Sequence, residues 1–173
     1  INIQNDLTPP VAKPKIPIEA GALYTGVYQF AVCYANINGD EQSSYYSKTN
    51  PMPIYEDRFS SYENTEGSQA NKLTDKAIPV EFSNLDIRYD YINLAVIKTV
   101  QGTPTYELVV TLPISTKEYL YTGRETTKLL SIDRILGLYP DYFNSKTITS
   151  ANNYLIRANM STQDEANYQP FAK

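Results

Sequence analysis

The segment that decides the fold is residues 24–35, YTGVYQFAVCYA. Successive side chains of a β-strand point to opposite sides of a sheet, so a sequence period of two predicts a strand. Large apolar residues occupy one side and smaller ones the other, namely Tyr24, Tyr28, Phe30, Val32 and Tyr34 against Val27, Ala31 and Cys33. Because both sides are apolar, the sequence predicts a strand that is buried largely on both faces.

Two hairpins are predicted from turn residues. The stretch Asn36–Asp40 contains Asn-Gly, which tolerates the positive φ of tight hairpin turns, so Glu41–Ser47 is expected to return as a more polar strand. Residues 89–98, YDYINLAVIK, form the most apolar predicted strand. A turn at residues 101–104 follows it, and Thr105–Leu112 is expected to run back beside it.

Further strands are predicted at residues 76–83, KAIPVEFS, and at Tyr119–Tyr121. Turn signals recur about every ten residues, which favours an antiparallel sandwich over parallel βαβ units. We therefore predict an all-β fold, an antiparallel β-sandwich that spans residues 21–122.

The approach to the strongest strand carries a possible tyrosine corner. Leu85 and Tyr91 have the spacing of the Leu…Tyr pair of fibronectin type III domains, in which the tyrosine hydroxyl bonds to nearby backbone. Tyr89 competes for the same role. This spacing predicts a fibronectin- or immunoglobulin-like form of the sandwich.

The N-terminal flank and one internal stretch differ from the strands in composition. Residues 1–20 are expected to form an extended arm or linker that could add an edge strand near Ile16–Ile18, because they carry Pro9, Pro10, Pro14 and Pro17. Residues 48–75 are polar and are expected to form a long binding or assembly loop, within which Ile54 and Tyr55 could form a short strand.

The C-terminal part, residues 123–173, is expected to form an extension beyond the sandwich. Ser131 can cap a short helix at Ile132–Leu136. The apolar stretch Tyr154–Ile156, within residues 147–159, reads as one more strand. The first residue is Ile1, so we expect the chain to be a piece of a longer protein, with this extension continuing into a neighbouring domain.

The residues of catalytic and metal sites are scarce. Histidine is absent and Cys33 is the single cysteine, which excludes Ser-His and Cys-His pairs, the usual zinc sets and an internal disulfide. No phosphate-binding glycine motif occurs. Cys33 lies in an apolar run and is expected to be a small buried residue. We predict a protein that is not an enzyme and has no cofactor and no bound metal.

The carboxylates leave alternatives open. Asp86 is expected to cap the turn before the apolar strand, and a calcium ligand role for it and Asp90 is the alternative. Asp40 and Glu41 are expected to be solvated turn residues. The acidic residues of the long loop are expected to be solvated, or alternatively to form a glycosidase pair or cation site, and these are Glu56, Asp57, Glu63 and Glu66.

Tyrosine is the unusual residue of this chain, with 16 copies against five phenylalanines and no tryptophan. Protein interfaces are enriched in tyrosine, and four tyrosines around the long loop are therefore candidate interface residues, namely Tyr45, Tyr46, Tyr55 and Tyr62. A sugar-binding platform would use the same residue type, and half-buried strand positions are the third possibility.

The charge of the chain weighs against nucleic acid as a partner. The net charge is −4, so no basic excess is available to neutralise phosphates, and sequence-specific nucleic-acid binding is not expected. No apolar run approaches the roughly 20 residues that a membrane span requires, so no membrane span is expected.

Four stretches together resemble one family across roughly residues 21–160. They are GVYQFAVCYANINGDEQSSYYSKTNPMPI, KAIPVEFSNLDIRYDYINLAVIKT, YTGRETTKLLSIDRIL and TITSANNYLIRAN. They resemble the stabilisation, tail nozzle or muzzle proteins of crAss-like, podovirus-like bacteriophages.

The resemblance implies a structural component of the virion tail. Such a protein would sit in a ring of its own copies, contact other phage tail proteins, and retain or guide packaged DNA. It implies no catalytic residues. A carbohydrate- or cell-surface-binding sandwich is the alternative function, and a glycosidase is a third.

Overall fold

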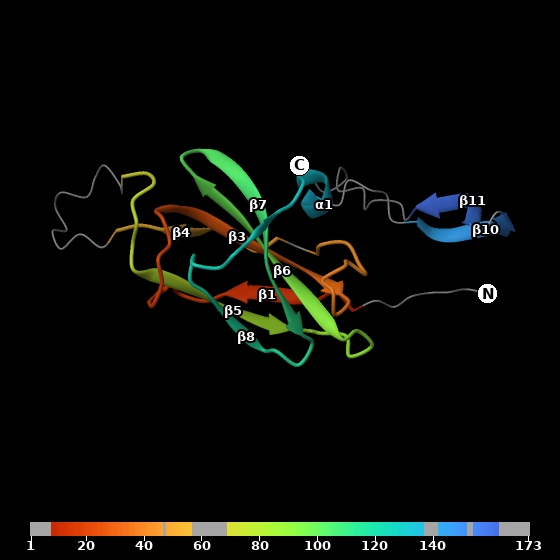
Figure 1. Cartoon of the computed structure of the whole chain (residues 1–173), viewed down its shortest axis with the longest axis horizontal. Helices are drawn as coiled ribbons and strands as arrows, with labels where there is room; N and C mark the ends of the chain where they lie inside the picture. Colours follow the sequence, from red (N-terminus) through yellow and green to blue (C-terminus); the bar gives the residue numbers. More distant parts are fainter. Residues whose placement is uncertain (1–7, 47, 57–68, 137–141, 152–153, 163–173) are drawn as a thin grey trace, which may run out of the picture. The chain divides into compact units, whose positions relative to one another are not determined.

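The computed structural model describes residues 8–46, 48–56, 69–136, 142–151 and 154–162 (Figure 1). The first three ranges belong to one compact unit and the last two to a second, and each unit is described by itself. Strand pairs in these ranges are antiparallel, which confirms the all-β class predicted from the sequence.

The first unit contains a large and a small sheet. The large sheet has the order β4-β3-β6-β7-β9, formed by Met52–Ile54, Gly26–Ala35, Tyr91–Val100, Thr103–Pro113 and Lys128–Leu129. In the small sheet, β5 has β1 and β2 along one edge and β8 along the other. Its strands are β1 (Val11–Pro14), β2 (Ile18–Glu19), β5 (Lys76–Ser83) and β8 (Glu118–Tyr121).

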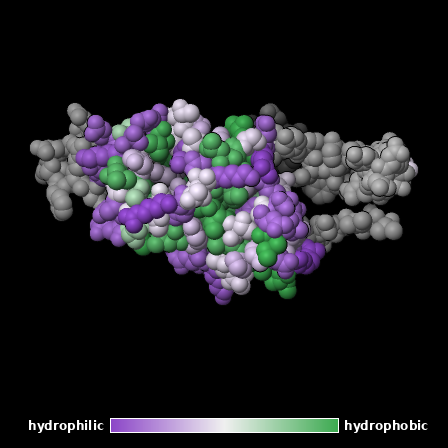
Figure 2. All heavy atoms as spheres, viewed as in Figure 1, coloured by the Kyte–Doolittle hydropathy of each residue, from purple (hydrophilic) through white to green (hydrophobic). Residues whose placement is uncertain are grey.

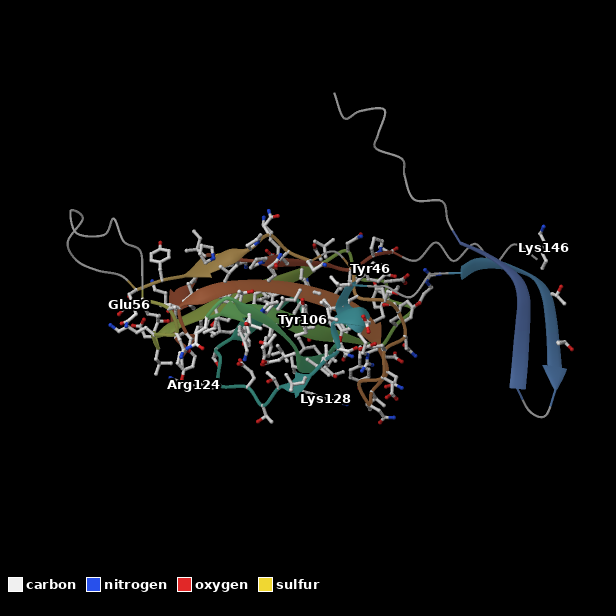
Figure 3. The ribbon with its side chains drawn as sticks, turned by 90° about the horizontal axis from the view of Figure 1, so that it is seen from above. Tyr46, Glu56, Tyr106, Arg124, Lys128 and Lys146 are labelled. Atoms are coloured by element: carbon white, nitrogen blue, oxygen red, sulfur yellow. The ribbon has the colours of Figure 1, made fainter. Side chains whose placement is uncertain are left out.

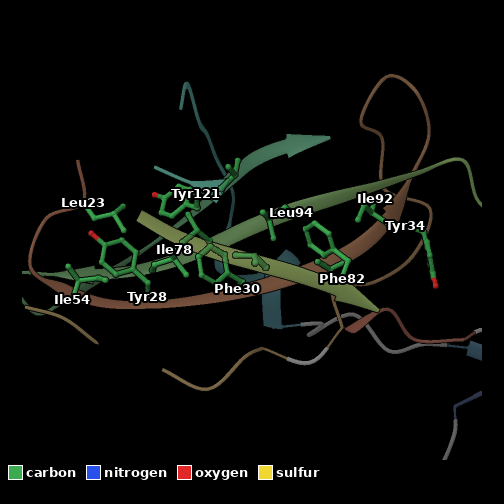
Figure 4. Close-up of a cluster of buried hydrophobic side chains, with 14 residues drawn as sticks. Leu23, Tyr28, Phe30, Tyr34, Ile54, Ile78, Phe82, Ile92, Leu94 and Tyr121 are labelled. Carbon is green, nitrogen blue, oxygen red and sulfur yellow. The ribbon is translucent and has the colours of Figure 1, made fainter. Parts of the chain in front are cut away.

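The main core lies between these two sheets, so they form an antiparallel sandwich (Figure 4). From the large sheet it takes the predicted face of β3, on which Tyr28 and Phe30 are at most 2% exposed. From the small sheet it takes alternate residues of β5 and Tyr121 of β8. The ring of Tyr121 meets that of Phe30 edge-on at 5.6 Å, a favourable aromatic geometry.

A second core covers the outer face of the large sheet. The small side chains of Ala31, Cys33 and Ala95 lie there with no exposed surface, under Tyr45 and Ile135. Ile135 belongs to α1 (Ile132–Leu136), the helix that the sequence predicted with these bounds. The prediction that β3 is buried on both faces is therefore confirmed.

A cluster of charged and polar side chains holds the segment that precedes this helix in place. Glu107 of β7 is only 5% exposed and binds Lys98 Nζ at 2.7 Å and Thr127 Oγ1 at 2.7 Å. Burial by itself would raise the pKa of Glu107, but these hydrogen bonds outweigh burial and lower it. Because Thr127 directly precedes β9, the ionised carboxylate holds β9 beside β7.

In its described part, residues 41–46, the segment after the first turn is not the regular strand that the sequence predicted at Glu41–Ser47. Beyond the Ala35–Glu41 bridge it follows the edge of β3, but side chains replace part of the backbone ladder. Tyr34 N donates to Ser43 Oγ at 2.9 Å and Phe30 N donates to Thr49 Oγ1 at 2.9 Å. Hydroxyl groups thus satisfy buried amides that a β-strand partner would otherwise satisfy.

The N-terminal segment, expected to be an arm, contributes β1 and β2 to the small sheet. The strand pairing is interrupted between β1 and β2 around Pro17, because proline has no backbone amide to donate. Within this interruption Lys15 N still donates a hydrogen bond to Pro79 O at 2.8 Å. An edge strand was expected near Ile16–Ile18, and β2 begins at the last of these residues, Ile18. The predicted domain boundaries at residues 20 and 122 stay predictions. The described residues between 8 and 136 belong to one compact unit.

In the second unit the structure has two strands where the sequence predicted one. β10 (Tyr142–Ala151) and β11 (Tyr154–Thr162) pair as a hairpin in which Ala151 lies opposite Tyr154. The two residues that separate these positions are Asn152 and Asn153, a residue type that hairpin turns favour. The sequence reading missed this signal because Asn-Asn is weaker than Asn-Gly.

The side-chain partner of Phe30 gives a stability test. Thr49 is 8% exposed, and Thr49→Val keeps its shape but removes the acceptor of Phe30 N. Leaving this buried amide unsatisfied should lower the free energy of unfolding by about 1–3 kcal/mol in urea denaturation. The exposed control Thr103→Val should change it by less than about 0.5 kcal/mol. Equal effects of the two variants would contradict the role of Thr49.

Candidate subunit interface

The three candidate interface tyrosines that the structure describes, Tyr45, Tyr46 and Tyr55, do not form one surface cluster. Tyr45 is 7% exposed and lies in the second core, where burial raises its pKa far above the usual range. Tyr46 is half-buried and packs on the other side of the same segment, against the main core. Figure 3 shows Tyr46 well apart from Glu56, the neighbour of Tyr55.

Tyr55 stands at the surface with 55% of its area exposed. Lys76 Nζ lies 5.6 Å from the centre of its ring, a cation–π contact. Next to it, Glu56 pairs with Lys72 at 2.6 Å. Tyr62 lies outside the described residues, so the interface role of the four tyrosines stays a prediction.

A tyrosine hydroxyl does bind the backbone of the turn before β6, and it belongs to Tyr34. This hydroxyl accepts from Asp86 N at 2.8 Å and donates to Thr8 O at 2.6 Å. Leu85 packs half-buried against the core, and Tyr91 is half-buried at the start of β6. The tyrosine corner of Leu85 and Tyr91 stays a prediction.

The same turn contains a second polar contact. Asp86 accepts a hydrogen bond from Arg88 N at 3.1 Å, as expected of a turn cap, and from Arg88 Nε at 2.9 Å. The Arg88 guanidinium holds the pKa of Asp86 at about 2, below its ordinary value of 3.8. The ring of Tyr34 stacks on that of Tyr89 at 4.2 Å, so this end of the sandwich is aromatic as well as ionic.

The carboxylates of the described residues bear on the metal and glycosidase alternatives. No group of three histidine, cysteine, aspartate or glutamate residues that could hold a metal occurs within the described ranges. An open hollow of about 590 Å³ between the ends of β3, β6 and β7 includes Asp90 as its single carboxylate. Glycosidases of the usual kind need two such groups across one site.

A profile of the family described as Crassvirus muzzle protein matches residues 1–170. The chain belongs to this family. The muzzle protein of Bacteroides phage crAss001 is 29% identical to it over 144 residues, which are 81% of this chain and 10% of that protein. The chain thus spans about a tenth of the length of this relative.

Membership of the muzzle family makes the chain a bacteriophage structural protein of the virion tail, as the resemblance implied. The fibronectin type III likeness stays a prediction. Among the described residues, no helix combines the length and the apolar character needed to cross a membrane.

Exposed apolar residues are the remaining feature of the described surface. Hydrophobic residues reach the surface in several separate groups among hydrophilic ones (Figure 2). Exposed apolar residues occur on or beside short strands, with Ile16 between β1 and β2, Ile18 on β2, Leu120 on β8 and Leu129 on β9. The sequence reading missed them because an isolated apolar residue in a short strand has no periodicity that reveals its exposure.

The hydroxyl of Tyr34 gives a test of the polar end of the sandwich. Tyr34→Phe keeps the ring stack but leaves the buried Asp86 amide without its partner. The free energy of unfolding should fall by about 1–3 kcal/mol in urea denaturation. The matched control Tyr55→Phe, at a ring that is 55% exposed, should change it by less than about 0.5 kcal/mol. A Tyr34→Phe protein as stable as the wild type would show that the hydroxyl is not structural.

Asp86 gives a pH test. Its folded pKa of about 2 lies below the ordinary 3.8, so its stabilising effect is full above about pH 4 and is lost as the pH falls through about 2. The difference in melting temperature between the wild type and Asp86→Asn should therefore shrink over this interval. Asp75→Asn, at an exposed side chain, serves as control. A difference that stays constant from neutral pH to pH 2 would exclude the ionised Asp86–Arg88 contact as its source.

Proposed function

We propose that this chain is a non-enzymatic packing module of a muzzle protein. It contacts neighbouring subunits in a ring of identical copies, together with other tail proteins, and through this ring helps to retain or guide packaged DNA. The observation that supports the proposal most strongly is the family match over residues 1–170.

The chemistry of the described residues supports a structural role. The most buried carboxylates are committed to contacts within the chain, with Glu107 bound by Lys98 and Thr127, and Asp86 bound by Arg88. Cys33 has no exposed surface, and burial raises the pKa of its thiol to about 12. A thiol that is both inaccessible and protonated is a poor nucleophile, which supports the non-enzymatic assignment.

The charge of the chain supports guiding DNA in preference to binding it. With a net charge of −4, the chain has a weak repulsion for the phosphate backbone and no basic excess to hold it. A passage for DNA benefits from walls that do not trap the moving polymer.

Carbohydrate recognition remains the alternative function, and Tyr55 is the residue that favours it. Its ring is exposed, as sugar stacking requires, but Lys76 already lies over it. Titration of the chain with host-derived polysaccharide should give no saturable response. A response that Tyr55→Ala abolishes would support the sugar-binding alternative.

The proposed function is tested by locating the chain in an intact phage particle. Electron microscopy should place residues 8–136 at the tail, repeated around its axis and in contact with neighbouring subunits. Cross-linking mass spectrometry of the same particles should join exposed lysines of this chain, such as Lys13 and Lys128, to other tail subunits. A chain that is free of subunit contacts in the particle would refute the proposal.

A further inference from the structure

We infer that the helix at the end of the first unit is a releasable latch. When closed, it covers part of the outer face of the large sheet, and it leaves that face while the sandwich stays folded. The latch is defined as residues 131–136, which contain α1. The inference goes beyond the packing role proposed above, because it concerns a conformational change within one copy.

The latch covers a core that is separate from the core of the sandwich. The second core lies on the outer face of the large sheet and contains Cys33 together with Tyr45 and Ile135. The main core lies between the two sheets and includes none of these residues. Removing the latch therefore leaves the packing of one sheet on the other in place.

One side chain anchors α1 to the sheet. Ile135 is 2% exposed, whereas Ile132 and Leu136 of the same helix are 44% and 40% exposed. Among the described residues, no backbone hydrogen bond joins residues 132–136 to either sheet. A helix of five residues is too short to be stable by itself, so α1 depends on the packing of Ile135.

An ion pair supplies the second attachment of α1. Arg134 Nε donates to Glu41 Oε2 at 3.1 Å, and Arg134 Nη2 lies 3.0 Å from Glu41 Oε1. Both side chains are partly exposed, so water and salt screen their attraction. The pair orients the helix, but it contributes little to holding the latch closed.

The segments beside the latch are fixed by backbone hydrogen bonds. On the N-terminal side of the latch, Leu130 N donates to Tyr106 O of β7 at 2.9 Å. In the other segment that covers the outer face, Gln42 N and Tyr46 N donate to the backbone of β3 at 2.8 and 2.9 Å. Opening therefore begins after Leu130 and does not require the segment around Tyr45 to leave the sheet.

Release of the latch lengthens the chain that follows the sandwich. α1 is the last element of the first unit, and the residues from 138 onward belong to the second unit (Figure 1). Five residues span about 7.5 Å as a helix and up to about 17 Å when extended. A subunit held in an assembly can then keep its contacts while the chain beyond it moves.

Cys33 reports the opening of the latch. It is the single cysteine of the chain, has no exposed surface, and belongs to the same core as Ile135. A thiol reagent reaches it only after part of its cover has opened. Global unfolding exposes a large surface and becomes steeply more frequent with urea, whereas the opening of one short helix depends little on urea.

The test measures the rate at which iodoacetamide, an uncharged reagent, alkylates Cys33 in the complete 173-residue chain. The wild-type rate should stay nearly constant at low urea. Ile135→Ala should raise the rate at least about tenfold, because it removes most of the anchor. Leu136→Ala, at an exposed side chain of the same helix, should raise it less than about twofold.

The matched control makes the same substitution in the main core. Ile78 of β5 has no exposed surface, so Ile78→Ala should lower the global stability of the sandwich. It should nevertheless leave the alkylation rate without urea unchanged. If Cys33 were reached only by global unfolding, Ile78→Ala would accelerate alkylation as Ile135→Ala does. Ile78→Val, a milder change, serves the same purpose if circular dichroism shows that Ile78→Ala is unfolded.

Hydrogen exchange followed by nuclear magnetic resonance locates the opening. In the Ile135→Ala variant, the amides of Gln42 and Tyr46 should keep their wild-type exchange rates, because their bonds to β3 are made outside the latch. Acceleration of these two amides in step with alkylation would mean that the whole outer cover opens, and this would overturn the inference.

Three further results would overturn the latch. They are a wild-type alkylation rate that rises steeply from the lowest urea concentrations, equal acceleration by the Ile135 and Ile78 substitutions, and an unchanged rate in Ile135→Ala. Each concerns the opening of α1 alone and leaves the place of the chain in the phage tail unaffected.

Discussion

The structure depends on the burial of both faces of β3. One face carries Tyr28, Phe30 and Tyr34 into the sandwich, and the other carries Ala31 and Cys33 outward with no exposed surface. An antiparallel sheet usually leaves one face in water, so this strand requires a cover on each side. The small sheet covers the inner face, and α1 with the segment around Tyr45 covers the outer face.

Irregular segments can cover the outer face of β3 because their side chains accept hydrogen bonds from backbone amides that no neighbouring strand satisfies. Ser43 and Thr49 accept the amides of β3 that no strand satisfies, and Glu107 fixes the approach to β9. Tyr34 links Thr8 and Asp86 at the end of the sandwich. Each contact satisfies a buried polar group, so short elements stay in place without long ladders.

The buried polar groups described above hold the fold together, and the surface keeps separate apolar residues. The muzzle family supplies the setting, a phage tail. The absence of histidine and the single cysteine exclude Ser-His and Cys-His pairs and the usual zinc sets at the level of composition.

By itself, the sequence determined the elements whose signals are local. The alternation in residues 24–35 predicted β3 and its double burial, and Ser131 with the apolar spacing after it predicted α1 with its observed bounds. The family resemblance was also carried by short stretches of sequence and was confirmed. Such features depend on neighbours a few residues apart, which a sequence pattern records.

Only the tertiary structure decided the roles that depend on distant partners. The hydroxyl of Tyr34 meets Asp86, 52 residues away, and Arg134 meets Glu41, 93 residues away. Strand pairing and packing determine which strands are neighbours, and this decides that Tyr45 belongs to a core and that Leu129 is exposed. The period of a strand fixes which side chains share a face, but the packing of sheets and covers decides whether that face is buried.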